Sequence, residues 1–298
     1  MGSEMCIRDR LMATDKRVLL APSMNVRMWE HAATQRNLVT LQQDGILFSG
    51  PNEGDMACGE FGLGRMSEPM EIVAATEAAL NDGPLKGTHV LVTSGPTHEP
   101  IDPVRYIANR SSGAQGKAIA QALLAKGAQV TFVTGPAAVA PPMGANVVPV
   151  ETAAEMLAAV QAAQNVDVGI FAAAVADWRM ATAADQKIKK DGNGLPVLEF
   201  AENPDILAAI CASKLRPRLV IGFAAETQNM VAAATAKRLR KGCDWIVAND
   251  VSPATGIMGG SENDVTLISD AGPEDWPRMG KDQVAQRLAQ KIVETLND

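Results

Sequence analysis

The sequence predicts a doubly wound α/β domain with a mostly parallel sheet over residues 85–298. Six apolar runs of strand length recur there, and Ala-rich runs of helical length separate most of them. The strand runs are continuously apolar rather than alternating, which is typical of strands buried on both faces of a parallel sheet. This alternation of strands and helices favours right-handed crossovers. We therefore expect ligands at the carboxyl ends of the strands.

A shorter segment precedes this domain. Residues 11–84 begin with a strand-like run at 17–22, continue as a loop-rich stretch dense in Gly and Met, and end in a helix-like run at 68–80. Asn81-Asp-Gly-Pro84 follows, and because Gly and Pro terminate helices, we place a domain boundary there. Beyond it, strands are expected at 89–93, 129–134, 166–174, 218–223, 244–248 and 264–268, and helices at 114–126, 153–164, 205–214, 229–241 and 282–296.

Composition and charge exclude several classes of protein. Hydrophobic residues make up 47% of the 298 residues and charged residues 20%, which suits a soluble globular protein with a large core. The net charge of −7 disfavours non-specific nucleic-acid binding, which needs a basic surface. No apolar run reaches the roughly 18 residues of a membrane span. The four cysteines lack metal or disulfide spacing, which indicates reduced thiols in the cytoplasm; they are Cys6, Cys58, Cys211 and Cys243.

Residues 1–10 stand apart from the rest of the chain. Their sequence, MGSEMCIRDR, has neither an apolar signal-peptide core nor a helical or strand period. Because MCIRDR resembles a translated sequencing adapter, we treat these residues as a non-native artefact. We expect the natural gene to begin further upstream.

A long loop after the first strand of the larger domain has the pattern of a phosphate site. Residues 93–113 lead from the strand to a Ser-Ser-Gly turn that opens a helix, whose N-terminal amides can face an anion. The loop is not a Walker A motif, because Ala118 follows Gly116-Lys117, and it is not a dinucleotide G-x-G-x-x-G loop. A surface loop with ordinary capping by Ser111 or Ser112 is the alternative.

Charged residues after later strands suit a nucleoside triphosphate. Asp177 ends a strand, where it can hold Mg²⁺ against phosphates, and the basic run 187–190 can neutralise them. In Lys237-Arg-Leu-Arg-Lys241 the two lysines share one helical face and can reach one phosphate group. The run 202–206 opens a helix and can line a base or ribose pocket. Each of these motifs also has an ordinary interpretation. Asp177 and the run 187–190 can be a strand end and a solvated basic turn, the lysine cluster can stabilise a helix end, and the run 202–206 can simply cap its helix.

The first segment holds two more candidates. Asn25 follows a strand, and Cys58 lies in a Gly-rich loop. A cysteine in such a loop is open to proton transfer or reaction, although free cysteine is more commonly a small buried hydrophobe. The three histidines have no spacing that suggests a metal site.

In this order, the motifs closely resemble the bifunctional phosphopantothenoylcysteine decarboxylase / phosphopantothenate–cysteine ligase family of coenzyme A synthesis. The ligase resemblance covers residues 85–298 and implies a Rossmann-like domain. It is carried by Gly95-Pro-Thr-His-Glu-Pro-Ile-Asp-Pro-Val-Arg105, Asn109-Arg-Ser-Ser-Gly113, Ala173-Ala-Val-Ala-Asp-Trp-Arg179, Lys187-Ile-Lys-Lys190, Asn203-Pro-Asp-Ile206, Gly222-Phe-Ala-Ala-Glu-Thr227, Lys237–Lys241 and Ala248-Asn-Asp-Val251.

This resemblance implies a CTP-dependent ligation of 4′-phosphopantothenate to L-cysteine through an acyl-cytidylate. Asn109 matches the essential residue beside that intermediate, and Arg110 and Ala173 are further substrate-binding positions. Mg²⁺ or Mn²⁺, held at Asp177, would bridge the triphosphate. The positions that match CTP binding are Asp177, Lys187, Asn203, Pro204, Asp205, Ile206, Phe223, Lys237 and Lys241.

The resemblance to the decarboxylase is partial. Asn25 matches a substrate-binding residue and Cys58 matches the proton donor, which implies the C-terminal part of a flavodoxin-like, FMN-dependent domain at 11–84. That segment has 74 residues, against roughly 100–150 for a typical domain. No residue matches the FMN phosphate loop or the family's catalytic histidine. We therefore expect an N-terminally truncated chain that is active as a ligase, inactive as a decarboxylase and free of FMN.

The family also implies a cytoplasmic enzyme that forms a homodimer through the ligase domain and has no nucleic-acid or membrane partner. Two other functions remain open. A non-catalytic nucleotide-binding protein would need the phosphate loops but not Asn109. A dehydrogenase would share the doubly wound sheet, but its Tyr-x-x-x-Lys motif is absent, because Tyr106 is the only tyrosine and position 110 is Arg.

Overall fold

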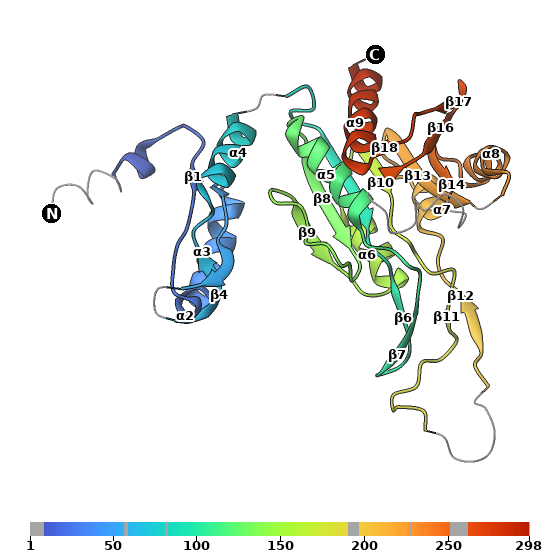
Figure 1. Cartoon of the computed structure of the whole chain (residues 1–298), viewed down its shortest axis with the longest axis horizontal. Helices are drawn as coiled ribbons and strands as arrows, with labels where there is room; N and C mark the ends of the chain where they lie inside the picture. Colours follow the sequence, from blue (N-terminus) through green and yellow to red (C-terminus); the bar gives the residue numbers. More distant parts are fainter. Residues whose placement is uncertain are drawn as a thin grey trace. The chain divides into compact units, whose positions relative to one another are not determined.

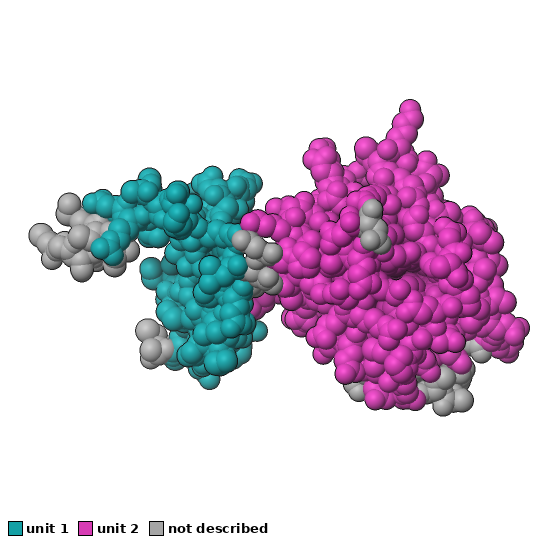
Figure 2. Space-filling view, turned by 90° about the horizontal axis from the view of Figure 1, so that it is seen from above, with its two compact units in different colours: residues 1–81 teal, residues 82–298 magenta. Residues whose placement is uncertain are grey.

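A computed structural model describes residues 9–56, 59–80, 83–189, 197–226, 228–250 and 262–297. The chain divides into two compact units, residues 1–81 and residues 82–298, which Figure 2 shows in different colours. None of the helices in the described part of the chain is both long and apolar enough to cross a membrane.

The larger unit is built on an eight-stranded sheet (Figure 1). Its strands are β5 (His89–Ser94), β8 (Gln129–Thr134), β9 (Asn146–Pro149), β10 (Val168–Phe171), β13 (Leu219–Glu226), β14 (Trp245–Asp250), β16 (Val265–Ser269) and β17 (Gly272–Asp275). The strand order is β17-β16-β14-β13-β10-β5-β8-β9. The six strands from β9 to β14 pair in parallel, and β16 and β17 are antiparallel. The prediction of a doubly wound, mostly parallel α/β fold is confirmed.

The direction of winding reverses between β5 and β10. The chain adds β8 and β9 on one side of β5, then returns to place β10, β13 and β14 on the other side. In an open parallel sheet such a reversal separates the loops that follow the two central strands, and a ligand crevice forms outside their carboxyl ends. The order therefore points to the loops after Ser94 and Phe171.

Helices cover both faces of this sheet. On one face lie α5 (Ala114–Ala125) and α9 (Lys281–Asn297), whose buried residues share a core cluster with Val90 and Val92 of β5. On the other face lie α6 (Ala153–Ala162), α7 (Ile206–Cys211) and α8 (Met230–Lys241), whose cluster includes Leu91. Neighbouring residues of β5 belong to different clusters because successive strand side chains point to opposite faces.

Two short hairpins form an arm that extends away from the sheet (Figure 1). One pairs β6 (His98–Asp102) with β7 (Arg105–Ala108), and the other pairs β11 (Trp178–Met180) with β12 (Phe200–Glu202). The first hairpin corrects the expectation of a continuous loop over 93–113. Asp102 makes the turn possible, because its Oδ1 accepts the amides of Val104 and Arg105 at 2.9 Å each. A small pair, β15 (Glu262–Asn263) and β18 (Met279–Gly280), completes the unit.

The smaller unit contains helices where the sequence predicted a loop-rich stretch. Its elements are β1 (Leu19–Leu20), α2 (Val26–Trp29), α3 (Ala32–Gln43), β2 (Leu47–Phe48), β3 (Asn52–Asp55), β4 (Phe61–Arg65) and α4 (Pro69–Leu80). The expected helix at 68–80 is α4. Helix α3 was missed because none of its residues is buried, so its sequence carries no strong apolar period.

Candidate functional site

A large cavity of about 1040 Å³ opens where the sheet order predicts a crevice. Residues 108–116 and 171–178, which follow β5 and β10, form much of its lining, together with residues 202–207 at the start of α7. Single residues from other elements complete it: Thr93, Phe223, Ala225, Lys237, Lys241, Asn249, Asn263 and Lys281. The cavity therefore draws its lining from both faces of the sheet.

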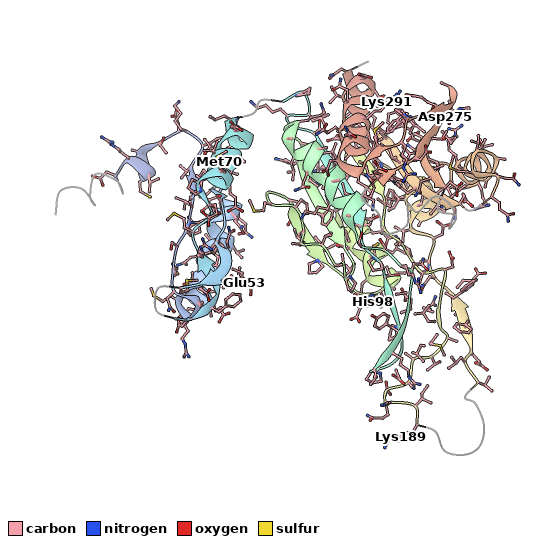
Figure 3. The ribbon with its side chains drawn as sticks, in the orientation of Figure 1. Glu53, Met70, His98, Lys189, Asp275 and Lys291 are labelled. Carbon is pink, nitrogen blue, oxygen red and sulfur yellow. The ribbon has the colours of Figure 1, made fainter. Side chains whose placement is uncertain are left out.

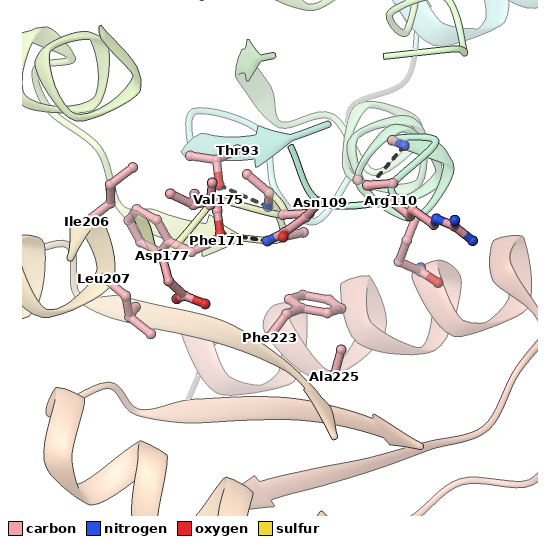
Figure 4. A pocket seen from close by; sticks show the side chains of 18 of the residues that line it. Thr93, Asn109, Arg110, Phe171, Val175, Asp177, Ile206, Leu207, Phe223 and Ala225 are labelled. Carbon is pink, nitrogen blue, oxygen red and sulfur yellow. Dashed lines mark hydrogen bonds between the residues drawn. The ribbon is translucent and has the colours of Figure 1, made fainter. Parts of the chain in front are cut away.

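The loop after β10 is fixed by hydrogen bonds from its backbone amides to the loop after β5. The amide of Ala174 donates to the carbonyl of Gly95 at 2.9 Å, and the amide of Ala176 donates to Thr97 Oγ1 at 3.0 Å. Asn109 is attached to the same loop, because its Nδ2 donates to the Val175 carbonyl at 2.9 Å. In Figure 4, Asn109 lies between Asp177 on one side and Arg110 on the other. The switch point, where the winding of the sheet reverses between β5 and β10, thus holds an uncharged amide within the cavity.

The start of α5 faces this cavity with little capping of its own. Its N-cap residue is Gly113, in the left-handed region with φ of 76°, and it has no side chain to accept a hydrogen bond. Ser111 and Ser112 accept the amides of Gly113 and Ala114 at 3.3 Å, longer than a typical bond. The helix begins close to β5, since a Cβ on Gly116 would lie 2.4 Å from Ser94 Oγ. Because the capping is weak, the amides of this first turn are available to bind an anion.

The other end of the cavity is formed by α7 and α8. Asp205 caps α7 by accepting the Ala208 amide at 3.0 Å, and it pairs with Lys241. Lys237 donates from Nζ to the Phe223 carbonyl at 2.8 Å. Burial lowers the pKa of Lys237, while in Asp205 burial is more than offset by Lys241 and the Ala208 amide, so the pKa of that carboxyl is lowered. Both lysines are held where an entering phosphate chain could replace their present partners.

Asp177 is an exposed carboxylate beside this end. The backbone carbonyl of Asp177 accepts the Asn203 amide at 2.9 Å. Two further carboxylates, those of Glu202 and Asp205, line the same cavity. The described residues contain no group of three or more His, Cys, Asp or Glu side chains that could hold a metal ion alone. Since Mg²⁺ commonly combines one or two carboxylates with phosphate oxygens and water, Asp177 fits a metal carried in with a triphosphate.

The cavity brings together most of the residues that the sequence singled out in the larger domain. They are Asn109, Arg110, Ala173, Asp177, Asn203, Pro204, Asp205, Ile206, Phe223, Lys237 and Lys241.

Three predicted residues lie elsewhere. Lys187 is on the arm and does not line the cavity; its neighbour Ile188 is hydrogen-bonded to Asp102, and Lys189 lies near the end of the arm (Figure 3). Asn25 is in the smaller unit, where Oδ1 caps α2 and Nδ2 donates to Glu60. Cys58 falls outside the described residues.

Other polar lining residues were assigned no role from the sequence. Asn249 lies on a predicted carboxyl strand end, so the rule that located Asp177 could have found it. Gln115, Asn263 and Lys281 carry no such signal, because they come from α5, β15 and α9, which only the folded sheet brings to one place.

The fold and its cavity define a doubly wound α/β protein with a polar, cation-lined crevice at the switch point. Residues 85–296 match the family model described as DNA/pantothenate metabolism flavoprotein C-terminal domain, and residues 4–81 match the model described as Flavoprotein.

Curated relatives and a solved structure agree with these matches. The chain is 42% identical over 298 residues to the coenzyme A biosynthesis bifunctional protein CoaBC of Vibrio cholerae, covering 99% of this chain and 74% of that protein. It is 44% identical over 289 residues to the Escherichia coli protein of that name, covering 95% and 70%. The crystal structure of the C-terminal domain of a CoaBC protein matches with 39% identity and a TM-score of 0.61, covering 73% of this chain and all of that one. The chain belongs to the CoaBC family of coenzyme A biosynthesis.

Proposed function

We propose that the larger unit ligates 4′-phosphopantothenate to L-cysteine at the expense of CTP. The observation that carries the proposal is the position of Asn109, whose amide is fixed by the Val175 carbonyl inside a cavity with Lys237 and Lys241 at one end. An uncharged donor next to cations suits a reaction in which two anionic groups, a carboxylate and a phosphate, must meet.

The proposed reaction has two steps. The pantothenate carboxylate attacks the α-phosphorus of CTP, which expels pyrophosphate and leaves an acyl-cytidylate. The cysteine amine then attacks the acyl carbon, loses a proton and expels CMP. Asn109 would donate to the acyl-cytidylate without adding charge, and Arg110 and Ala173 would contact the pantothenoyl part. The rigid loop 172–176 would keep both reacting groups in line.

The nucleotide would lie toward α7 and α8. Lys237 and Lys241 would neutralise phosphates as point charges, and the residues from Asn203 to Ile206, together with Phe223, would surround the nucleoside. Asp177 would hold Mg²⁺ or Mn²⁺, which neutralises the triphosphate when bound. Lys187 remains a predicted CTP ligand supplied by the arm.

The test compares pyrophosphate release from CTP, Mg²⁺ and 4′-phosphopantothenate, with and without cysteine. We expect cysteine-stimulated turnover in the wild type and a loss of roughly a hundredfold or more in Asn109→Ala, as for other donors to a reacting group. Asn146→Ala is the matched control, since Asn146 is exposed at the start of β9 and does not line the cavity. Full activity in Asn109→Ala would contradict the assigned role.

A non-catalytic nucleotide-binding protein is the competing function. The lysines and the start of α5 would serve binding equally well, so calorimetric titration with CTP decides between the two. Tight binding without pyrophosphate release would favour the binding protein.

We also propose that the chain as given does not act as a decarboxylase. A bound FMN would supply redox chemistry there, but the described residues of the smaller unit fit its phosphate poorly. At the start of each of α2, α3 and α4 one amide is already accepted by a side chain: the amides of Arg27, Ala33 and Glu68 donate to Asn25, His31 and Glu71. Asn25 and Cys58 therefore stay candidates without a derived step. Purified protein that carries flavin and releases CO₂ from phosphopantothenoylcysteine would contradict this proposal.

The arm supports a homodimer formed by the larger unit. Its hairpins expose large apolar side chains, among them Tyr106 at 54%, Trp178 at 59% and Phe200 at 56%. Such a patch is typical of a surface that another protein covers. Light scattering on the purified chain should give twice the monomer mass, and Trp178→Glu should reduce it to that of a monomer. A monomeric wild type would contradict the proposal.

A further inference from the structure

The cavity contains a cation to which the proposed ligation gives no task. Lys281 is the first residue of α9 and lines the cavity. Because α9 and α5 pack on one face of the sheet while α7 and α8 pack on the other, Lys281 approaches from the side opposite Lys237 and Lys241. The cavity therefore carries positive charge from both faces.

A chain of side-chain amides fixes the start of α9 beside the first turn of α5. Asn263 Nδ2 donates to Gln115 Oε1, and Gln115 Nε2 donates to the Lys281 carbonyl, both at 3.3 Å. Asn263 is only 5% exposed and Gln115 is half-buried, so the pair is packed within the fold. All three residues line the cavity, which places a polar wall around the lysine.

No anion among the described residues compensates Lys281. Its ammonium makes no hydrogen bond or ion pair within the described part of the chain, whereas Lys241 has Asp205. The carboxylates that line the cavity belong to residues 177 and 202–205, near α7. Partial burial lowers the pKa of Lys281, as expected for a cation that lacks a partner.

We propose that Lys281 binds a second phosphoryl group of the ligation substrates, on the face of the sheet opposite Lys237 and Lys241. This inference rests on the proposed function. The substrates offer two sources of that chemistry, the terminal phosphates of CTP and the 4′-phosphate of phosphopantothenate. A lysine serves either as a mobile point charge, and the weakly capped first turn of α5 beside it adds amide donors.

The test uses Lys281→Gln, with Lys281→Arg to keep the charge and Lys214→Gln as control, because Lys214 is exposed and outside the cavity. We expect Lys281→Gln to raise one KM by roughly tenfold or more, the scale of a lost charge-assisted hydrogen bond. Lys281→Arg should recover most of the affinity. KM values within twofold of wild type in Lys281→Gln, or an equal rise in Lys214→Gln, would overturn the proposal.

The two phosphate sources give different patterns. If Lys281 holds the terminal phosphates, the KM for CTP and the inhibition constant for pyrophosphate rise together, and the KM for phosphopantothenate does not change. If it holds the 4′-phosphate, only the KM for phosphopantothenate rises, and the preference over pantothenate without its phosphate shrinks. Either pattern supports the site and identifies its occupant.

Failure of the proposed ligase function can be distinguished from failure of the Lys281 proposal. In the first case the wild type binds substrates but releases no pyrophosphate. Lys281 is then tested by calorimetry on the full chain with inorganic pyrophosphate and with phosphopantothenate as probes. A tenfold loss of affinity for either probe in Lys281→Gln, at an unchanged melting temperature, supports the site. Equal affinity in wild type and variant for both probes overturns it.

Discussion

Asp205 uses its two carboxylate oxygens for different helices, with Oδ1 on the Ala208 amide at the start of α7 and Oδ2 on Lys241 at the end of α8. One side chain thus joins the two helices at one end of the cavity. The pair is partly open to solvent, with the Asp205 side chain 43% exposed and that of Lys241 19% exposed. Its electrostatic contribution is therefore modest, and the cap is the stronger of the two tasks.

The two tasks of Asp205 can be separated by substitution. Asp205→Asn keeps an oxygen for the cap and loses the ion pair, so we expect it to lower the free energy of unfolding by less than about 1 kcal/mol. Asp205→Ala loses both and should cost about 1–2 kcal/mol. Urea denaturation measures the difference, and Asp205→Ser, which retains a capping oxygen, is the control. Equal losses in the Asn and Ala variants would mean that the cap contributes nothing.

Lys237 should give nucleotide binding an alkaline limit. Burial lowers its pKa, so it loses its proton at a pH below the usual lysine value of about 10.4. Affinity for CTP should then fall as the pH rises toward that value, because a neutral amine no longer attracts phosphate. Calorimetric titration across alkaline pH measures the change. Lys237→Arg, whose guanidinium stays charged, should remove the limit, and an identical pH profile in that variant would assign it to another group.

Gly116 should resist a substitution that normally stabilises helices. A Cβ there would lie 2.4 Å from Ser94 Oγ, so Gly116→Ala must push α5 away from β5. We expect a loss of about 1–3 kcal/mol in the free energy of unfolding, instead of the gain of about 1 kcal/mol that alanine gives in an open helix. Ser94→Gly in the same chain should restore much of the loss. Gln121→Ala, at an exposed position of α5, is the control and should be nearly neutral.

Asp102 should fix the segment around Ile188, which carries Lys187 and Lys189, to the first hairpin of the arm. Its Oδ2 accepts the Ile188 amide at 3.1 Å, and Arg105, which pairs with it, donates to the Ile188 carbonyl at 3.0 Å. Asp102→Asn should speed hydrogen exchange at Ile188 and tryptic cleavage after Lys187, with Asp185→Asn as control.

The hydrogen bond from the Ile188 amide to Asp102 should weaken as the pH falls. The bond from Arg105 holds the pKa of Asp102 well below its usual range. A lowered carboxyl pKa contributes stability that is complete above the unfolded value near 3.9 and is lost as the pH falls toward the folded value. Protection of Ile188 should therefore persist at pH 5 and weaken only under strong acid. Loss of protection already between pH 7 and pH 5 would contradict this.

The regular helices and strands of the larger unit were predictable because each has its own local pattern, an apolar run for a strand or an Ala-rich run for a helix. The apolar run at 129–134 and the Ala-rich run from Ala114 coincide with β8 and the start of α5. The candidate ligands that follow strand ends, such as Asp177, were found for the same reason, since the sheet gathers those ends into one crevice.

The arm and the α9 side of the cavity were not predictable from local pattern. The hairpin around Asp102 contains Pro100 and Pro103, which mask a strand signal, and its turn depends on a side chain that accepts backbone amides. Lys281 follows β18, which pairs antiparallel with β15, so the rule about the ends of parallel strands does not apply to it. Its place depends on the packing of α9 against α5, a contact between residues far apart in the sequence.

The late position of α9 has a consequence during synthesis on the ribosome. Its buried residues, including Leu288 and Ile292, cover the same face of the sheet as α5, and its first residue closes one side of the cavity. A nascent chain that has released every strand but not this helix exposes an apolar face and an unfinished crevice. Ligand binding at this cavity therefore requires α9, and the proposed nucleotide should protect from proteolysis only those chains that include this helix.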